Sequence, residues 1–242
     1  MKDPVDREIG RLTRRSLLTG GVAALAGVGA WEWLRSRRPD DEVAWPLRLG
    51  LRTNEQLARD YFRETRLART FAPSDVESLR TNGDIGIEDD VDPDWKLHVM
   101  GDAPLTLTLD EIKALPKVEM ITELKCIEGW SRINKWGGAR FRDFVNKYAP
   151  RQSDPGAHVA LRTPDGEYYV GLDMASALHP QTLLCYEMNG APLTPEHGAP
   201  LRLFTPVKYG IKNLKRIGTI AFSATRPPDY WAERGYDWYA GF

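Results

Sequence analysis

The residue with the clearest chemical potential in this sequence is a cysteine. Residues 124–131, LKCIEGWS, place Cys126 at the end of an alternating apolar and polar run, with Glu128 and Trp130 close behind it. A thiolate is a nucleophile and a soft metal ligand, whereas a lone cysteine at the end of a strand is more often a small buried hydrophobe. Residue type alone leaves both alternatives open for Cys126, while Cys185 lies in an apolar run and is expected in the core.

A stretch free of acidic residues, 198–228, is the second feature that could bind a ligand. It carries six basic side chains, namely Arg202, Lys208, Lys212, Lys215, Arg216 and Arg226. Gly210 would let backbone N–H groups approach a phosphate closely, and His197 lies just upstream. A solvated basic surface is the alternative. Because apolar residues are interleaved, part of the stretch must be buried, so its cations need either distant acids or a bound anion.

Charge and cysteine content exclude several classes of protein. Eight of the 33 basic and four of the 34 acidic residues lie in 1–38, which leaves a net charge of −5 for the rest. A domain of that charge is a poor nucleic-acid binder, so no nucleic-acid partner is expected. Two cysteines exclude a disulfide framework and a four-cysteine zinc or iron–sulfur site. The six acids of 84–94 lack calcium-loop spacing and predict a solvated loop.

The first 38 residues are typical of an export signal. Arg14 and Arg15 precede an apolar run from Leu17 to Trp31, and such an arginine pair indicates the twin-arginine route, which exports folded proteins. The alternative is a basic, amphipathic N-terminus of a cytosolic protein. Small-residue sites would allow cleavage, whereas the run is nearly long enough to span a bilayer. We therefore expect a location in the periplasm or on the outer face of the cytoplasmic membrane, with cleavage or anchoring left open.

The elements that must position these residues are mostly strands. Periodicity predicts a surface helix over 54–71 after a linker at 40–49, a short helix over 110–115 capped by Asp110, and helical spacing from Phe141 to Tyr148. Strands are expected at 96–100, 105–109, 118–126, 158–163, 167–172, 182–188, 200–205 and 216–224. Turn signals at 164–166 and at Asn189-Gly190 join two hairpins. This pattern predicts an α+β domain of mixed sheets with short helices.

Six segments resemble, in order, the sulfite oxidase superfamily of molybdopterin oxidoreductases, most closely the catalytic subunits of bacterial periplasmic methionine-sulfoxide reductases and their small relatives. They lie at 80–84, 126–131, 178–183, 197–202, 208–215 and 225–228. The resemblance implies a sulfite-oxidase-type molybdopterin-binding domain at 76–242, after a signal or anchor at 1–38 and a linker with a surface helix at 39–75. It also implies one molybdenum–molybdopterin per chain, with Cys126 as the protein ligand of the metal.

The resemblance carries over to the site residues as well. Cys126, Glu128 and Trp130 fall at catalytic positions, and the match is less secure for Asn82 and Thr163 because the spacing around them differs. The residues expected to bind the cofactor are Asn82, Cys126, Thr163, His197, Arg202, Lys208, Gly210, Lys212, Asn213 and Lys215.

The position four residues after the cysteine bears on the substrate. Sulfite oxidases proper have an arginine there, whereas this sequence has Trp130, with Glu128 nearby. This favours oxygen-atom transfer with a neutral sulfoxide, such as methionine sulfoxide, unless Trp130 only packs in the core. Sulfite-oxidase-like oxidation of a small compound and a cofactor-free binding protein of the same fold are the alternatives. Without a haem or flavin motif, electrons must come from a separate partner, which the resemblance suggests is a haem-bearing membrane subunit.

Overall fold

The computed structural model describes residues 4–36, 43–87, 91–101, 103–152, 154 and 156–242, so residues 88–90 of the expected acidic loop lie outside the described residues. The chain forms two compact units, residues 1–51 and residues 52–242. Each unit has its own contacts and is described by itself below.

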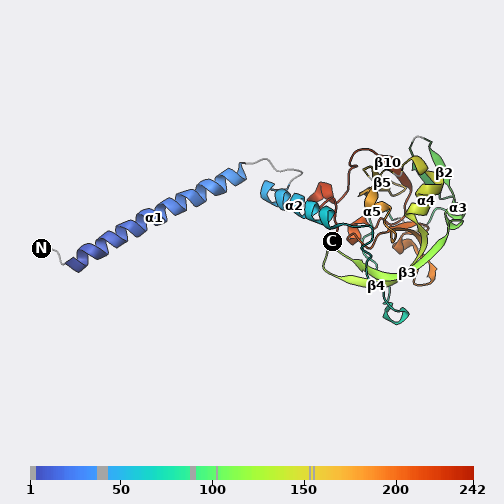
Figure 1. Cartoon of the computed structure of the whole chain (residues 1–242), viewed down its shortest axis with the longest axis horizontal. Helices are drawn as coiled ribbons and strands as arrows, with labels where there is room; N and C mark the ends of the chain where they lie inside the picture. The colour runs from blue at the N-terminus through green and yellow to red at the C-terminus, as the bar shows by residue number, and fades with distance from the viewer. Residues whose placement is uncertain (1–3, 37–42, 88–90, 102, 153, 155) are drawn as a thin grey trace. The chain divides into compact units, whose positions relative to one another are not determined.

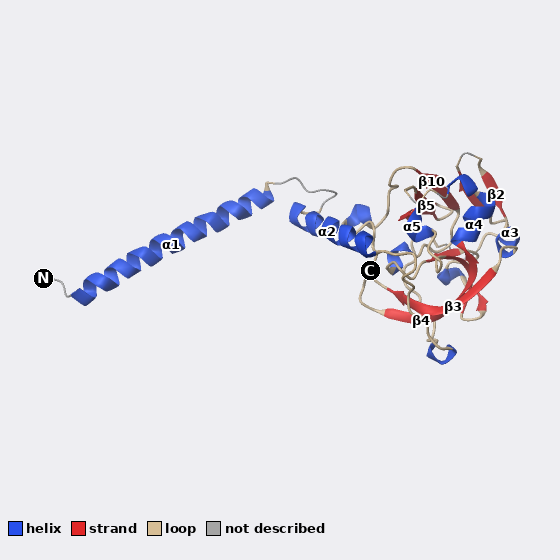
Figure 2. Ribbon diagram, in the orientation of Figure 1, coloured by secondary structure: helices blue, strands red, loops and turns tan. Residues whose placement is uncertain are grey.

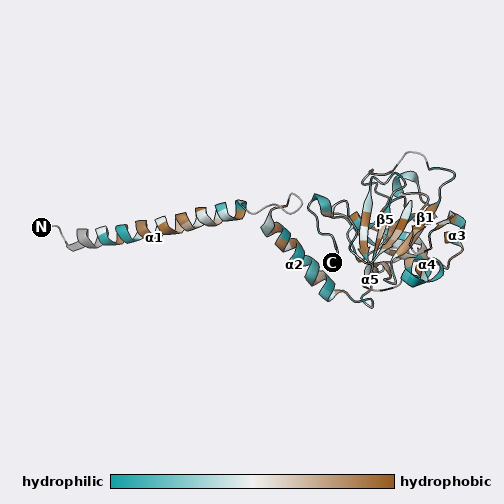
Figure 3. Ribbon diagram, turned by 90° about the horizontal axis from the view of Figure 1, so that it is seen from above, coloured by the Kyte–Doolittle hydropathy of each residue, from teal (hydrophilic) through white to brown (hydrophobic). Residues whose placement is uncertain are grey.

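The first unit consists mainly of the helix α1, Pro4–Arg35. Its segment Gly10–Arg35 is long and apolar enough to cross a membrane by length and composition, and none of this segment is buried. Figure 3 shows apolar residues along much of this helix. The expected N-terminal apolar helix is therefore present.

The helix α2, Trp45–Tyr61, begins and ends about ten residues before the surface helix expected at 54–71. That expectation was wrong for residues 62–71, because backbone groups in this segment form hydrogen bonds with other parts of the domain and not within a helix. The Gln181 side chain bonds both N–H and C=O of Ala68, at 2.7 and 3.0 Å. Phe71 then donates its N–H to the Ile121 carbonyl at 3.0 Å. Residues 45–49 of the expected linker form the first turn of α2 instead, and its residues 40–42 lie outside the described residues.

The second unit holds two five-stranded sheets and belongs to the α+β class, as expected (Figures 1 and 2). All pairs are antiparallel except β1 with β10, so the first sheet is mixed. Its order is β2 (Leu105–Leu107), β1 (Leu97–Met100), β10 (Thr219–Ser223), β5 (His158–Arg162), β6 (Tyr169–Asp173). The second has the order β3 (Lys117–Lys125), β4 (Ser131–Arg140), β7 (Leu183–Met188), β8 (Ala191–Pro192), with β9 (Arg202–Phe204) also pairing with β7.

Strand β7 explains how the second sheet can carry a site. Leu184 and Tyr186 on one face join the main core, whereas Leu183 and Cys185 on the other face join a smaller cluster with Trp136 and Phe204. A strand buried on both faces reads as a continuous apolar run. The smaller cluster supports the functional pocket described below, and Cys185 is a buried core residue, as expected.

Short helices close the ends of the sheets. Thr108, not Asp110, caps α3 (Leu109–Lys113): its hydroxyl accepts from the Glu111 N–H, and Glu111 reaches back to the Thr108 N–H. A reciprocal pair of this kind needs Ser or Thr three residues before Glu, which moves the helix start back by one residue. The other helices are α4 (Phe141–Tyr148), α5 (Met174–Ala177) and 3-10 turns at 73–75, 150–152, 195–197, 210–212 and 232–234.

Both predicted hairpin turns are present. Asn189 and Gly190 have φ values of 51° and 83° and join β7 to β8, as the Asn-Gly pair indicated. Gly166, with φ of 76°, lies in the connection between β5 and β6.

Candidate functional site

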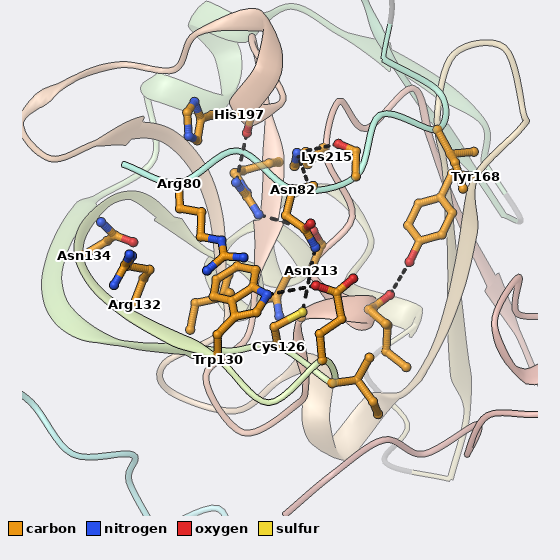
Figure 4. Close-up of a pocket in the computed structure, with 18 of the residues that line it drawn as sticks. Arg80, Asn82, Cys126, Trp130, Arg132, Asn134, Tyr168, His197, Asn213 and Lys215 are labelled. Atoms are coloured by element: carbon orange, nitrogen blue, oxygen red, sulfur yellow. Dashed lines mark hydrogen bonds between the residues drawn. The ribbon is translucent and has the colours of Figure 1, made fainter. Parts of the chain in front are cut away.

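One pocket collects most of the residues singled out in the sequence. It has a volume of about 230 Å³ and lies where the smaller core cluster, with Trp136 and Met188, meets loops from distant parts of the chain. Of the expected site residues it is lined by Asn82, Cys126, Glu128, Trp130, His197, Arg202, Gly210, Asn213 and Lys215. The structure thus brings together segments that lie far apart in sequence, as Figure 4 shows.

Cys126 is held by the tight connection between β3 and β4. Its N–H donates to the Trp130 carbonyl at 2.8 Å, and the turn closes through Gly129, whose φ of 87° suits glycine. The side chain lines the pocket and is only 9% exposed. Burial raises the pKa of the Cys126 thiol, and the Glu128 backbone N–H partly offsets this rise. The protein alone therefore does not produce a thiolate here, whereas a bound metal cation would.

Gly210 lies directly against this turn. A side chain on Gly210 would meet the Lys125 carbonyl oxygen at 3.4 Å and the Cys126 Cα at 3.7 Å. The glycine therefore allows the 3-10 turn Gly210–Lys212 to pack closely on the chain at Cys126. Its smallness serves a contact between two protein segments as well as the approach of a ligand.

Lys215 gathers three segments at one point of the pocket wall. Its ammonium donates to the carbonyls of Asn82, Gly83 and Glu196 at 2.7 to 2.8 Å. Asn82 in turn points its Nδ2 at the Cys126 sulfur, 3.8 Å away, a contact drawn as a dashed line in Figure 4. Burial, followed by the nearby Arg202 charge, lowers the pKa of Lys215 to about 8. Lys215 thus supplies a positive charge to the pocket and fixes the position of Asn82.

Gly198 makes room for Lys215, which gives a testable expectation. Gly198 has φ of +93°, and an added Cβ would lie 2.7 Å from the Lys215 Cβ. Gly198→Ala should lower the free energy of unfolding by more than about 1 kcal/mol and displace Lys215. Denaturant unfolding of the purified variant measures the loss. The matched control is Gly166→Ala, which has φ of +76° but open space around the new methyl group. An equal loss in both variants would show that only backbone strain matters at Gly198.

His197 and Arg202 leave buried polar atoms with no partner among the described residues. The His197 Nδ1 pairs with the Thr194 hydroxyl at 2.8 Å, and the Arg202 guanidinium donates to the carbonyls of His197 and Asn213. The His197 Nε2 and the Arg202 Nε remain unbonded, although both residues line the pocket. Burial lowers the pKa of Arg202 to about 10 and, with the Arg202 charge, lowers that of His197. Buried nitrogens of this kind need a partner, and in a pocket that partner can be a ligand or an ordered water.

The charges around the pocket favour an anion. Glu128 is the single carboxylate among the lining residues, which are all described, whereas the basic ones are Arg80, Arg132, Arg202 and Lys215. Arg132 is already neutralised, because its Nη1 lies 3.0 Å from Glu77. The lining therefore retains a positive surplus beside the Cys126 sulfur, as a phosphorylated or otherwise anionic cofactor would need.

The mouth of the pocket is built around Trp130. Its indole N–H donates to Glu128 at 2.9 Å, and the Arg80 guanidinium lies 4.2 Å from the ring centroid. Trp130 lines the pocket where sulfite oxidases proper have an arginine, but this part of the pocket is not free of cations, since Arg80 covers the face of Trp130. Trp130 is half-buried at the pocket, so core packing does not account for its position.

Three expected cofactor residues lie elsewhere. Lys208 and Lys212 are buried in ion pairs with Asp173 and Asp229, at 3.4 and 2.5 Å, and neither lines the pocket. The sequence left open whether acidic residues or a bound anion neutralise the basic stretch. For Lys208 and Lys212 the partners are acidic residues from distant parts of the chain. Thr163 is also buried, and its hydroxyl donates to Asp165 at 2.5 Å within the turn between β5 and β6. These three residues stabilise the protein around the site rather than forming its wall.

Sequence reasoning missed several residues of the pocket wall. Trp136 stacks on Phe204 with ring centroids 3.9 Å apart, and Trp231 meets Tyr236 edge to face. Arg80 belonged to a segment that carried the family resemblance, but nothing in that segment indicated its contact with Trp130. Gly83, Arg132 and Asn134 were not anticipated either, and the other unanticipated wall residues are Ile85, Ile87, Leu124, Ile127, Tyr168, Met188 and Ile211. Their residue types do not distinguish them from core residues.

Known proteins resemble this chain over most of the second unit. The model of the oxidoreductase molybdopterin binding domain matches residues 83–231. A putative protein-methionine-sulfoxide reductase subunit YedZ1 from Azospira oryzae is 41% identical over 135 residues, which cover 55% of this chain and 50% of that protein. The uncharacterized oxidoreductase YuiH from Bacillus subtilis is 35% identical over 157 residues, covering 64% and 77%.

A third relative matches nearly the whole chain. It is the protein-methionine-sulfoxide reductase catalytic subunit MsrP from Xanthomonas axonopodis pv. citri, 32% identical over 255 residues, which cover 93% of this chain and 74% of that protein. The family model covers more than half of the chain and includes the turn with Cys126 and the cations of the pocket wall. The chain therefore belongs to the oxidoreductase molybdopterin-binding domain family, within the sulfite oxidase superfamily, and is an enzyme of the molybdopterin-dependent oxidoreductase class.

Proposed function

We propose that this enzyme transfers an oxygen atom at a molybdenum–molybdopterin centre and reduces a sulfoxide-type substrate such as methionine sulfoxide. The observation that carries the proposal is the Cys126 thiol in a pocket whose wall also presents buried, unpartnered nitrogens on His197 and Arg202. The names of the Azospira and Xanthomonas relatives, both protein-methionine-sulfoxide reductase subunits, support the substrate class.

The residues of the pocket fit one such cofactor per chain. Cys126 would supply the thiolate ligand of the metal, the Arg202 Nε would donate to the pterin or its phosphate, and the His197 Nε2 would bond to the same group. Lys215 adds positive charge, while Asn82 and Asn213 complete the polar wall. When bound, the cofactor supplies a two-electron metal centre that can exchange an oxygen atom with a substrate.

The mouth residues would select and orient the substrate. The Trp130 ring offers an apolar face of suitable size for the carbon groups of a sulfoxide, and its hydrogen bond to Glu128 fixes the ring. Arg80 favours a second candidate, the oxidation of sulfite or another small compound, because its guanidinium would bind an anionic oxygen. Arg80 here comes from a different segment than the arginine of sulfite oxidases proper.

We further propose that the electrons come from a separate protein, such as a haem-bearing membrane subunit. The arginine pair in the first half of α1 and the apolar run that follows it in the same helix support export of the folded protein by the twin-arginine route, to the periplasm or the outer face of the membrane. In this proposal residues 1–38 are the signal or anchor, 39–75 connect it, and 76–242 form the molybdopterin-binding domain.

Purified protein tests the function directly. Elemental and pterin analysis should find about one molybdenum and one molybdopterin per chain, and an artificial electron donor should support reduction of methionine sulfoxide. Sulfite oxidation by the same preparation, with no sulfoxide reduction, would select the second candidate. A folded preparation that lacks metal and pterin, even after expression with an intact cofactor pathway, would leave only a binding protein of the same fold.

A further inference from the structure

The helix α2 presents an apolar face to solvent and charged residues to the domain. None of its 17 residues is buried, and Leu47, Leu57 and Tyr61 are 66%, 50% and 65% exposed. Within the second unit, Glu55 pairs with Arg226, and Arg59 lies 5.2 Å from the Tyr239 ring centroid. An amphipathic helix on a globular domain normally packs the other way round, with its apolar stripe on the core.

Three of the five large exposed apolar residues of α2, Leu47, Leu57 and Tyr61, lie on one side of the helix, whereas Trp45 and Leu49 lie on the opposite side near its start. At 3.6 residues per turn, Leu47, Leu57 and Tyr61 fall within a sector of about 80°, and Glu55 and Arg59 fall outside it. The ion pair and the ring contact thus fix the helix with its apolar side outward. An apolar surface that the fold itself turns outward marks a contact with another hydrophobic phase.

The sequence that precedes α2 indicates that this hydrophobic phase is a lipid bilayer. Gly10–Arg35 of α1 could cross a membrane by length and composition, and nine residues separate Arg35 from Trp45. Ten peptide steps reach at most about 35 Å, so a membrane-spanning α1 would keep the start of α2 near the lipid surface. Trp31 and Trp33 lie at the end of the apolar segment with Arg35 behind them, a composition typical of the interface between lipid and water.

We propose that α1 remains attached as a membrane span and that α2 lies in the lipid headgroup region, with Leu47, Leu57 and Tyr61 facing the acyl chains. The charged side of α2 stays on the domain, so lipid contact requires no rearrangement of the domain. A domain held in this way would meet a membrane-bound electron donor at a high effective concentration. The proposal concerns attachment and does not rest on the cofactor or the substrate.

Fluorescent labels on the full-length holoenzyme in lipid nanodiscs test this arrangement. Cys126 and Cys185 are both buried, so an environment-sensitive dye can be placed selectively at Leu47→Cys, Leu57→Cys or Gln56→Cys. Gln56 is exposed on the same helix outside the apolar sector and is the matched control. Leu25→Cys reports on α1. Discs of phosphatidylethanolamine and phosphatidylglycerol with nitroxide-labelled acyl chains provide the quencher.

We expect dyes at Leu47 and Leu57 to be quenched at least about twofold more than the dye at Gln56, and the dye at Leu25 to be quenched most. Equal quenching at Leu57 and Gln56, with Leu25 deep in lipid, would overturn the surface position of α2. An unquenched dye at Leu25 would overturn the membrane span. Protection of Leu57 that appears only when a membrane partner protein is added would assign the apolar face to that protein and also overturn the proposal.

Discussion

Cys126→Ser is expected to abolish oxygen-atom transfer while the protein keeps its fold. The serine hydroxyl is nearly the same size as the thiol, and the groups that face the sulfur, the Asn82 amide and the Glu128 N–H, can also bond to an oxygen, so little packing is lost. A hydroxyl is a poor ligand for a metal that prefers soft thiolate. Because losing an outer-shell partner alone costs about 10–100-fold in metal affinity or activity, removal of the ligand itself should cost more than about 100-fold. Molybdenum content measures the loss of the metal ligand, circular dichroism measures the retained fold, and steady-state sulfoxide reduction measures the lost activity.

Cys185→Ala is the matched control for this prediction. Cys185 is fully buried in β7, and burial raises the pKa of its thiol to about 12, so it behaves as a small core residue. Its replacement should lower stability modestly and leave activity per bound molybdenum unchanged. Full activity of Cys126→Ser, or equal losses in the two variants, would contradict the assignment of Cys126 as the ligand.

Lys212→Met should produce the largest loss of stability. The Lys212 ammonium is completely buried, 2.5 Å from Asp229 and 3.0 Å from the Gly171 carbonyl. Methionine fills a similar volume but leaves the Asp229 carboxylate buried without its cation. Breaking a buried pair in this way costs about 3–5 kcal/mol, and for a domain of this size each kcal/mol lowers Tm by roughly 2–4 °C. Denaturant unfolding of the metal-free protein measures the loss.

The double variant Lys212→Met/Asp229→Asn separates pairing from other effects. It removes both charges and should recover a substantial part of the stability lost in the single variant, because no unpaired charge remains buried. The sequence predicted Lys212 as a cofactor-binding residue. If the single variant kept its stability but lost pterin, that prediction would be right and the structural role of Lys212 would be wrong.

The elements that follow simple periodicity could be predicted well. Residues 118–126 alternate apolar and polar side chains, and β3 covers Lys117–Lys125. The Asn189-Gly190 pair indicated a turn whose left-handed φ values suit those two residues. In contrast, the end of α2 depends on the Gln181 side chain, 113 positions away from Ala68. Local sequence contains no signal of a helix that ends because distant groups bind the next residues.

The cations of the site show the same limit more sharply. Arg202, Lys208, Lys212 and Lys215 have one composition and lie close together in the sequence. Only Arg202 and Lys215 line the pocket. Lys208 and Lys212 instead form buried ion pairs with Asp173 and Asp229, which come from other parts of the chain. A basic side chain can pair with an acidic residue of the protein or face a bound anion. Residue type and spacing therefore could not distinguish Arg202 and Lys215 from Lys208 and Lys212.

The sequence by itself determined the family, the α+β class, the cysteine suited to a soft metal and the need of the basic stretch for counter-charges. These conclusions rest on residue type, order and local periodicity, which a linear chain already contains. The tertiary structure decided which cations face Cys126, that Arg80 covers Trp130, and that His197 and Arg202 keep buried nitrogens without a partner among the described residues. These properties depend on distances between residues far apart in the chain and on burial, and both arise only when the sheets and loops pack together.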